Sequence, residues 1–251
     1  MKQVENIKMN EQFKPFFEQY EALSASVERA FESVKNQFPD CVKCKPFCAD
    51  CCYAVFDLTF IEAMYINERF RNKYNGENLN ILMERCNKID RTLYKLKKSA
   101  YKAVESGKEE KEILHEMAET RIRCPMLNDA EMCEIYDFRP LTCKLYGIPT
   151  AIGSEGYTCG LSGFEKGEKY PTANLDKIQN KLLQLSADLA ASIQSKYSRL
   201  GEILVPLSMA MATDYDDEYL GIRKADETDA EAAEKIVTTK QNQAREGRSN
   251  D

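Results

Sequence analysis

Residues 13–38, FKPFFEQYEALSASVERAFESVKNQF, contain the pattern that decides the fold. Apolar side chains recur every three or four residues in this stretch, at Phe13, Phe16, Tyr20, Leu23, Val27, Phe31, Val34 and Phe38. This spacing places them on one face of an α-helix, and a proline disfavours helical backbone at the residue before it. The sequence therefore predicts a long amphipathic helix that ends just before Pro39.

Residues 78–105 and 175–200 repeat the same three-and-four alternation over many turns. A shorter helix is expected at residues 59–74, where Thr59 and Glu62 have the spacing of a capping box. Three long helices with apolar faces are typical of a mainly α protein. We expect a helical bundle in which two cysteine-rich loops converge on a metal site.

The remaining stretches complete this outline of the chain. Residues 109–121 predict one more short helix, whereas residues 204–213 fit either a short helix or a buried extended segment. Residues 226–251 are acidic and polar, without an apolar face, and we expect a solvated tail there. The sequence thus predicts a single helical domain at residues 1–225 that contains a cysteine-cluster region at residues 41–160.

Nine of the ten cysteines lie in two blocks, residues 41–52 and residues 124–159. Thiolates are the soft ligands that bind zinc and iron–sulfur clusters, so closely spaced cysteines indicate a metal site. The tenth, Cys86, lies on the apolar face of residues 78–105, where a single cysteine is most simply a small buried hydrophobic side chain.

Composition and charge exclude several function classes. The chain start has no apolar core of signal-peptide length, and no apolar run could span a bilayer, which predicts a cytoplasmic protein without membrane contact. Cysteines in a reducing compartment are metal ligands or redox groups more often than disulfides. A net charge of -6 argues against nonspecific nucleic-acid binding. The expected partner is an unknown protein or redox partner.

The first block contains two pairs of cysteines, Cys41-x2-Cys44 and Cys48-x2-Cys51, each with a spacing that allows two sulfurs to bind one ion. Cys52 follows Cys51 directly, and adjacent side chains diverge, so these two thiols need not serve the same metal. The cysteines of the second block are separated by roughly ten to fifteen residues. Such spacing suits a chain that wraps around a site.

Three motifs carry a resemblance to a known family, namely Cys44-x3-Cys48-x2-Cys51-Cys52, RCPML at residues 123–127 and CEIYDFRPLTCKLYG at residues 133–147. On these motifs the sequence resembles the YkgJ cysteine-cluster family, described as a zinc- or iron-chelating domain and often labelled an iron–sulfur oxidoreductase. The usual first motif of the family is C-x2-C-x2-C-C. This chain has three residues in the first gap, which leaves open whether Cys41 or Cys44 is the equivalent ligand.

The resemblance implies a set of metal ligands, and two further residues of the second motif are expected on physical grounds to contact the cofactor. The implied ligands are Cys44, Cys48, Cys51, Cys52, Cys124, Cys133, Cys143 and Cys159. Tyr136 and Arg139 are the expected cofactor contacts. Arg139 either balances the negative charge of the thiolates or forms a loop-fixing ion pair with Asp137 or Glu134, and the sequence does not decide between these two roles.

Four thiolates suit a structural zinc site and a four-iron cluster equally, but the composition and the family label together favour an iron–sulfur cluster, 4Fe–4S, over zinc. Structural zinc sites often include imidazole, and this chain has one histidine, His115. The expected function is an iron–sulfur protein with a redox or electron-transfer role. One alternative is a zinc-stapled interaction module.

The other alternative is an enzyme that uses S-adenosylmethionine, because relatives of the family include flagellin lysine N-methylases. Cys44-x3-Cys48-x2-Cys51 also has the spacing of the radical S-adenosylmethionine motif. That chemistry belongs to alternating β and α units, whereas this block lies between predicted helices. The spacing alone is therefore a weak argument for radical chemistry.

Overall fold

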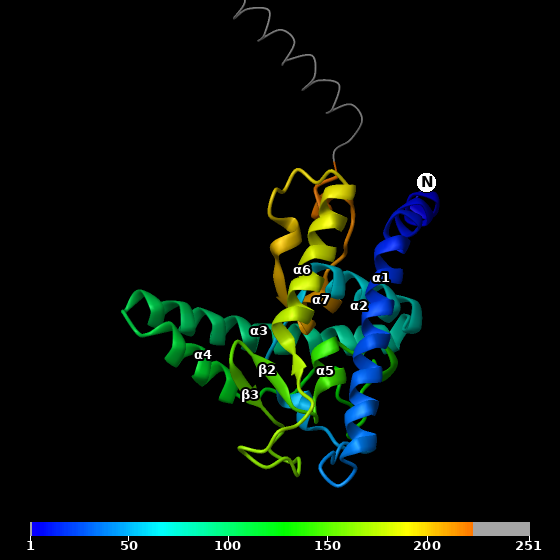
Figure 1. Ribbon diagram of the computed structural model, residues 1–251. Helices are drawn as coiled ribbons and strands as arrows, with labels where there is room; N and C mark the ends of the chain where they lie inside the picture. Colours follow the sequence, from blue (N-terminus) through cyan, green and yellow to red (C-terminus); the bar gives the residue numbers. More distant parts are fainter. Residues whose placement is uncertain (1, 223–251) are drawn as a thin grey trace, which may run out of the picture.

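The computed structural model describes residues 2–222 and confirms a mainly α fold (Figure 1). The helices are α1 (Lys2–Gln37), α2 (Phe60–Lys73), α3 (Gly76–Glu105), α4 (Glu110–Glu119), α5 (Leu141–Leu145), α6 (Leu175–Ser192), α7 (Leu207–Ala212) and α8 (Asp217–Leu220). The strands are β1 (Asp57–Thr59), β2 (Thr150–Ile152), β3 (Glu155–Tyr157), β4 (Ala173–Asn174) and β5 (Leu204–Pro206). The predicted tail at residues 226–251 lies outside the described residues.

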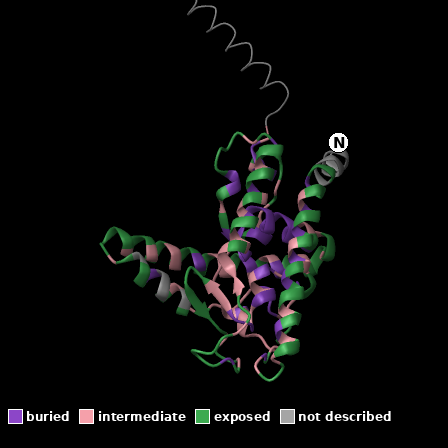
Figure 2. Cartoon of the chain, in the orientation of Figure 1, coloured by how far each residue is buried: buried purple, intermediate pink, exposed green. Residues whose placement is uncertain are grey.

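The buried residues gather at the centre of the molecule, in α2 and on the inner sides of the helices around it (Figure 2). α1 packs against α2, α5 and α6. It buries Phe13, Tyr20, Val27 and Val34 of the predicted apolar face, and it buries Phe17 where Phe16 was expected. The helix ends at Gln37, as Pro39 predicts.

Helix α2 begins where it was expected, but its first turn does not form the predicted capping box. The Thr59 side chain makes no capping hydrogen bond, and its buried Oγ1 has no partner among the described residues. Glu62 turns inward instead, where its Oε1 accepts from the Tyr20 hydroxyl at 3.0 Å and from the Leu141 amide at 2.8 Å. The Glu62 carboxylate therefore connects α1, α2 and α5 instead of capping the first turn of α2.

Two small sheets connect segments that are far apart in the sequence. β1 pairs antiparallel with β5, with Leu58 opposite Val205. β2 pairs antiparallel with β3 and parallel with β4. Residues 204–213, which the sequence left open, therefore contain both structures, strand β5 and then helix α7.

The second half of α3 and all of α4 form a hairpin that extends away from the rest of the molecule (Figure 1). α3 buries Leu82, Cys86 and Leu93, but Tyr101 and Val104 near its end are exposed. Within residues 2–222, no helix combines the length and the apolar character needed to cross a membrane.

Candidate metal centre

The first cysteine segment leaves the end of α1 and folds back through tight turns. The Cys48 amide donates to the Lys45 carbonyl at 3.0 Å, and the 3-10 helix η1 (Asp50–Tyr53) then carries Cys51 and Cys52. Phe47, between these turns, adopts a left-handed conformation with φ of 69°. Cysteines 44, 48, 51 and 52 are thus held on a short, strongly curved stretch of backbone.

The second cysteine segment is attached to the first by backbone hydrogen bonds. The Ile122 amide donates to the Tyr53 carbonyl at 3.1 Å, and the Cys124 amide donates to the Cys52 carbonyl at 2.7 Å. Ala54 and Arg121 form an antiparallel bridge beside them. This pairing places Cys52 next to Cys124, although 71 residues separate them in the sequence.

The backbone of the second segment is ordered by its own contacts. Leu127 and Cys133 form an antiparallel bridge, and the Glu134 amide donates to the Met126 carbonyl at 2.8 Å. The short helix α5 then carries Cys143. Arg123 closes the loop, because its guanidinium donates to the Asn128 carbonyl at 2.7 Å and pairs with Glu131 at 3.1 Å.

Cysteines of both segments line one cavity of about 630 Å³. The seven that line it are Cys44, Cys48, Cys51, Cys52, Cys124, Cys133 and Cys143. Cys41 does not line the cavity; its carbonyl accepts from the Gly163 amide at 2.8 Å. Cys44, rather than Cys41, therefore lies with the other thiols that line the cavity.

Cys159 and Cys86 lie outside the lining of this cavity, for different reasons. The Cys159 thiol lies 3.4 Å from Oδ2 of Asp50, which also accepts from the Tyr146 hydroxyl at 2.9 Å. Arg121 pairs with the other carboxylate oxygen at 2.5 Å. Cys86 is fully buried in the core, as its place on the apolar face predicts, and burial raises its pKa to about 12.

Three thiols share hydrogen bonds at the centre of the cavity. Bonds from the thiols of Cys143 and Cys52 lower the pKa of Cys51, and the positive charge of Arg139 lowers it further. The same hydrogen bonds, together with burial, raise the pKa of Cys52 and of Cys143. The opposite shifts show that these three side chains interact directly with one another.

The remaining thiols form two sets, each of which interacts with Cys51. Burial raises the pKa of Cys124 to about 12, with repulsion from Cys133 and Cys51 adding to it. On the other side, burial raises the pKa of Cys44 to about 12, and repulsion from Cys48, Cys159 and Cys51 adds to it. We name Cys51, Cys52, Cys124, Cys133 and Cys143 the inner thiols, and Cys44, Cys48 and Cys159 the outer thiols. Cys51 is the member that interacts with both groups.

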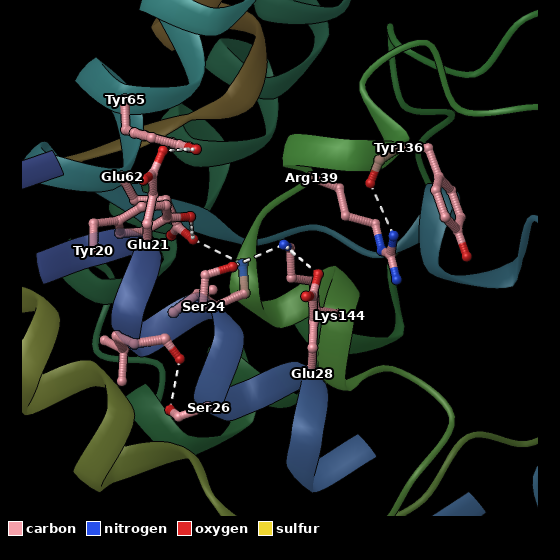
Figure 3. Close-up of polar contacts among 12 residues, drawn as sticks. Tyr20, Glu21, Ser24, Ser26, Glu28, Glu62, Tyr65, Tyr136, Arg139 and Lys144 are labelled. Atoms are coloured by element: carbon pink, nitrogen blue, oxygen red, sulfur yellow. Dashed lines mark hydrogen bonds and ion pairs between the residues drawn. The ribbon is translucent and has the colours of Figure 1, made fainter. Parts of the chain in front are cut away.

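Arg139 is oriented by Tyr136 and faces the inner thiols. Its guanidinium lies 3.9 Å from the centre of the Tyr136 ring and donates to the Tyr136 carbonyl at 2.8 Å (Figure 3). Its charge lowers the pKa of both Cys51 and Cys133. Among the described residues it forms no ion pair with Asp137 or Glu134, so the geometry favours charge balance over a loop-fixing pair.

Gly147 approaches Cys44 more closely than any other residue type could. A Cβ at this position would lie 2.2 Å from the Cys44 sulfur, and the backbone has φ of 108°. The Cys44 thiol donates to the neighbouring Tyr146 carbonyl at 3.3 Å. Only glycine both permits this contact and adopts this conformation without strain.

Lys144, next to Cys143, is a functional residue that the sequence analysis missed. It is buried, and its Nζ donates to Oγ of Ser24 at 2.8 Å and to Glu28 at 2.6 Å (Figure 3). These bonds attach α5 to α1 and so position Cys143. A lysine between Cys143 and Leu145 carries no periodic signal, so only the tertiary contact to Glu28 identifies it.

The residues present suit a soft metal, although their side chains do not yet converge on one point. Among the side chains that the structure describes, no group of three or more His, Cys, Asp or Glu is arranged as a formed metal site. Of the inner thiols, Cys52 and Cys143 hydrogen-bond to Cys51 instead, and binding an ion would require the thiols to turn toward a common centre. The donors are sulfurs that share a cavity with a cationic guanidinium, which is the donor set of zinc–thiolate and iron–sulfur sites.

Comparisons with known proteins agree with this donor set. No curated protein and no solved structure gave a significant match to the chain. Residues 43–160, which hold every cysteine of the cavity, match a family model described as "CxxCxxCC: Putative zinc- or iron-chelating domain". Over these residues the chain is similar to the CxxCxxCC family, to which that description of zinc or iron chelation belongs.

Proposed function

We propose that the cavity binds an iron–sulfur cluster and that the protein has a redox or electron-transfer role. The observation that carries this proposal is the shared cavity, lined by seven cysteines from two distant segments. The family, which chelates zinc or iron, supports the metal class. The proposed ligands are drawn from Cys44, Cys48, Cys51, Cys52, Cys124, Cys133, Cys143 and Cys159.

The composition of the cavity favours iron–sulfur over zinc. The part of its lining that the structure describes contains seven thiols, more than the four that close a structural zinc site. Clusters of iron and sulfide with thiolate ligands carry negative charge, and their reduction potentials depend on nearby charge and hydrogen bonds. Arg139 supplies such a charge to Cys51 and Cys133. A bound cluster would accept and donate single electrons.

The protein's own residues would hold the ligands in place and shield them. Backbone pairing fixes Cys52 beside Cys124, Gly147 leaves room for the Cys44 sulfur, and Lys144 attaches the helix of Cys143 to α1. Asp50 connects the outer thiol Cys159 to Tyr146 and Arg121. These contacts would hold the proposed ligand cysteines in position.

Anaerobic purification followed by iron, zinc and sulfide analysis tests this function. We expect iron and acid-labile sulfide in equal amounts, with visible absorption that is lost on adding dithionite and returns on controlled reoxidation. Colourless protein that contains zinc alone would overturn the redox role and would support a zinc-stapled module. Iron that does not change its absorption with dithionite would also contradict electron transfer.

A further inference from the structure

The cavity beside the cysteines is larger than a metal centre requires. A single ion occupies about the space of one water molecule, roughly 30 Å³. Four irons and four sulfides, each allowed roughly the same volume as that water, would fill less than half of the 630 Å³ present. Much of the cavity therefore lies beyond any centre that the thiols could hold.

One part of the lining is apolar and comes from several elements. It consists of Phe31 from α1, Val55 and Phe56 before β1, Ile89 and Leu93 from α3, and Leu207 from α7. Organic ligands are bound in cavities of roughly 300–1,000 Å³ lined mainly by such side chains, with a few polar groups that set orientation. The size and the lining both fit an organic molecule.

The charges in the lining leave two cations without a carboxylate partner. Glu28 pairs with Lys144, Glu32 with Lys35 and Glu131 with Arg123. These pairs use every carboxylate that lines the cavity, and among the described residues neither Arg139 nor Lys45 forms an ion pair. Arg139 faces the inner thiols. Lys45, next to Cys44, could therefore pair with a negatively charged group of a ligand in the cavity.

Exposed apolar side chains surround the mouth of the cavity. Phe47, Met132 and Tyr136 all line it, and they are 68 %, 45 % and 60 % exposed. They come from both cysteine segments, so the opening lies where the two segments meet. A ligand can therefore reach the cavity from solvent beside the metal centre.

We propose that the part of the cavity beyond the thiols binds an organic molecule with an apolar body and an acidic group, next to the metal centre. The body contacts the wall formed by Phe31, Ile89, Leu93 and Leu207, and the acidic group pairs with Lys45. This function goes beyond metal binding, because a site that only stabilises the fold has no need of an adjoining apolar cavity.

Two matched fluorescent probes test this proposal, 8-anilinonaphthalene-1-sulfonate and its uncharged analogue N-phenyl-1-naphthylamine. The protein is used with the metal it carries after anaerobic purification, or with added zinc where it carries none, and metal content is measured separately. We expect one sulfonate probe per chain to bind while the metal stays in place. Leu93→Trp should weaken both probes at least tenfold, because the indole would fill the apolar part.

Control variants separate this result from loose hydrophobic binding. Tyr101→Trp, on the exposed part of α3, should change neither probe. Lys45→Glu should weaken the sulfonate probe several-fold and leave the uncharged probe unchanged. If Leu93→Trp loses helical circular dichroism, Ile89→Trp on the same wall is measured in its place.

Three results would overturn the proposal. Release of one metal equivalent per probe bound would mean that the probe occupies the metal's own space. Unchanged probe binding in a folded Leu93→Trp or Ile89→Trp variant would show that the apolar wall is not the binding surface. If Lys45→Glu weakens both probes equally, Lys45 does not pair with an acidic group of the ligand, and that part of the proposal is wrong. If the protein binds the probe but no metal, the proposed metal-binding function fails and the proposed organic-ligand site stands.

Discussion

At the scale of single residues, the ten cysteines have different surroundings, and these surroundings predict different consequences of substitution. Cys51 accepts hydrogen bonds from two thiols and interacts with both the inner and the outer group. Cys86 is fully buried in the core and does not line the cavity. The sequence separated these two cysteines correctly by their spacing, but it did not show that Cys51 is central.

Cys51→Ser should abolish metal binding, because it removes the thiol shared by the two groups. Cys86→Ser is the matched control: it should keep the metal and lower the free energy of unfolding by about 1–3 kcal/mol, since it buries a hydroxyl in an apolar site. Metal analysis and urea denaturation measure the two effects. Metal loss in the Cys86 variant would contradict its place in the core.

Gly147→Ala should displace the Cys44 sulfur, because the added Cβ would lie 2.2 Å from it at a φ of 108°. We expect a cost of about 2–4 kcal/mol in unfolding free energy, from steric overlap and left-handed backbone together. Metal affinity should also fall at least tenfold. Gly156→Ala, with no atom within 4 Å of its Cβ position, is the control and should behave like the wild type. Unchanged metal affinity in the Gly147 variant would exclude Cys44 as a ligand.

Glu62 provides a prediction for pH. Burial raises the pKa of this carboxyl, while bonds from the Leu141 amide and the Tyr20 hydroxyl, and the charge of Lys144, oppose the rise. Because the folded pKa exceeds the unfolded value of 4.5, the stability that the protonated group contributes is lost as pH rises through the folded pKa.

Glu62→Gln resembles the protonated carboxyl and does not titrate. Its unfolding free energy, minus that of the wild type, should therefore increase as pH rises from 4.5 through the folded pKa of Glu62. Urea denaturation at several pH values measures this difference. A difference that stays constant over the range would show that Glu62 titrates as it does in the unfolded chain.

At the scale of elements, apolar periodicity predicted the helices well and the short pairings not at all. Phe13, Tyr20 and Val27 identify α1 because one face of a helix needs only local spacing. The pairing of Cys52 and Tyr53 with residues 122–124 has no alternating pattern, and it forms because tertiary contacts bring the two segments together. The exposed strand β3 (Glu155–Tyr157) likewise lacks an apolar face that could have predicted it.

The start of α2 provides the prediction at this scale. Thr59 precedes the helix but makes no capping bond, and its buried hydroxyl has no partner among the described residues. Thr59→Val should therefore raise the unfolding free energy by up to about 1 kcal/mol, because it removes an unsatisfied polar group at nearly constant shape.

Asn174→Ala is the matched control for this prediction. Asn174 caps α6, where its side chain accepts from the Lys177 amide at 2.8 Å, and its loss should cost about 1 kcal/mol. Thermal or urea denaturation compares the two variants. Equal destabilisation of both would show that Thr59 does cap α2.

At the scale of the whole molecule, the helices bring together two cysteine segments that lie far apart in the sequence. Lys144 attaches α5 to α1, Glu62 joins α1, α2 and α5, and the pairing beside Cys52 completes the arrangement. The sequence identified the cysteines and the helices, because thiol spacing and apolar periodicity are local signals. Lys144, Gly147 and the inward turn of Glu62 depend on contacts between distant residues, which no local pattern encodes.

X-ray absorption at the metal edge is the most direct test of the central claim, that thiols of both segments bind one kind of metal centre. We predict a first shell of about four sulfur atoms at roughly 2.3 Å and no nitrogen or oxygen ligand. Cys51→Ser and Cys143→Ser, one from each segment, should both lose this signal. A first shell of nitrogen or oxygen, or an unchanged sulfur shell in either variant, would contradict the account.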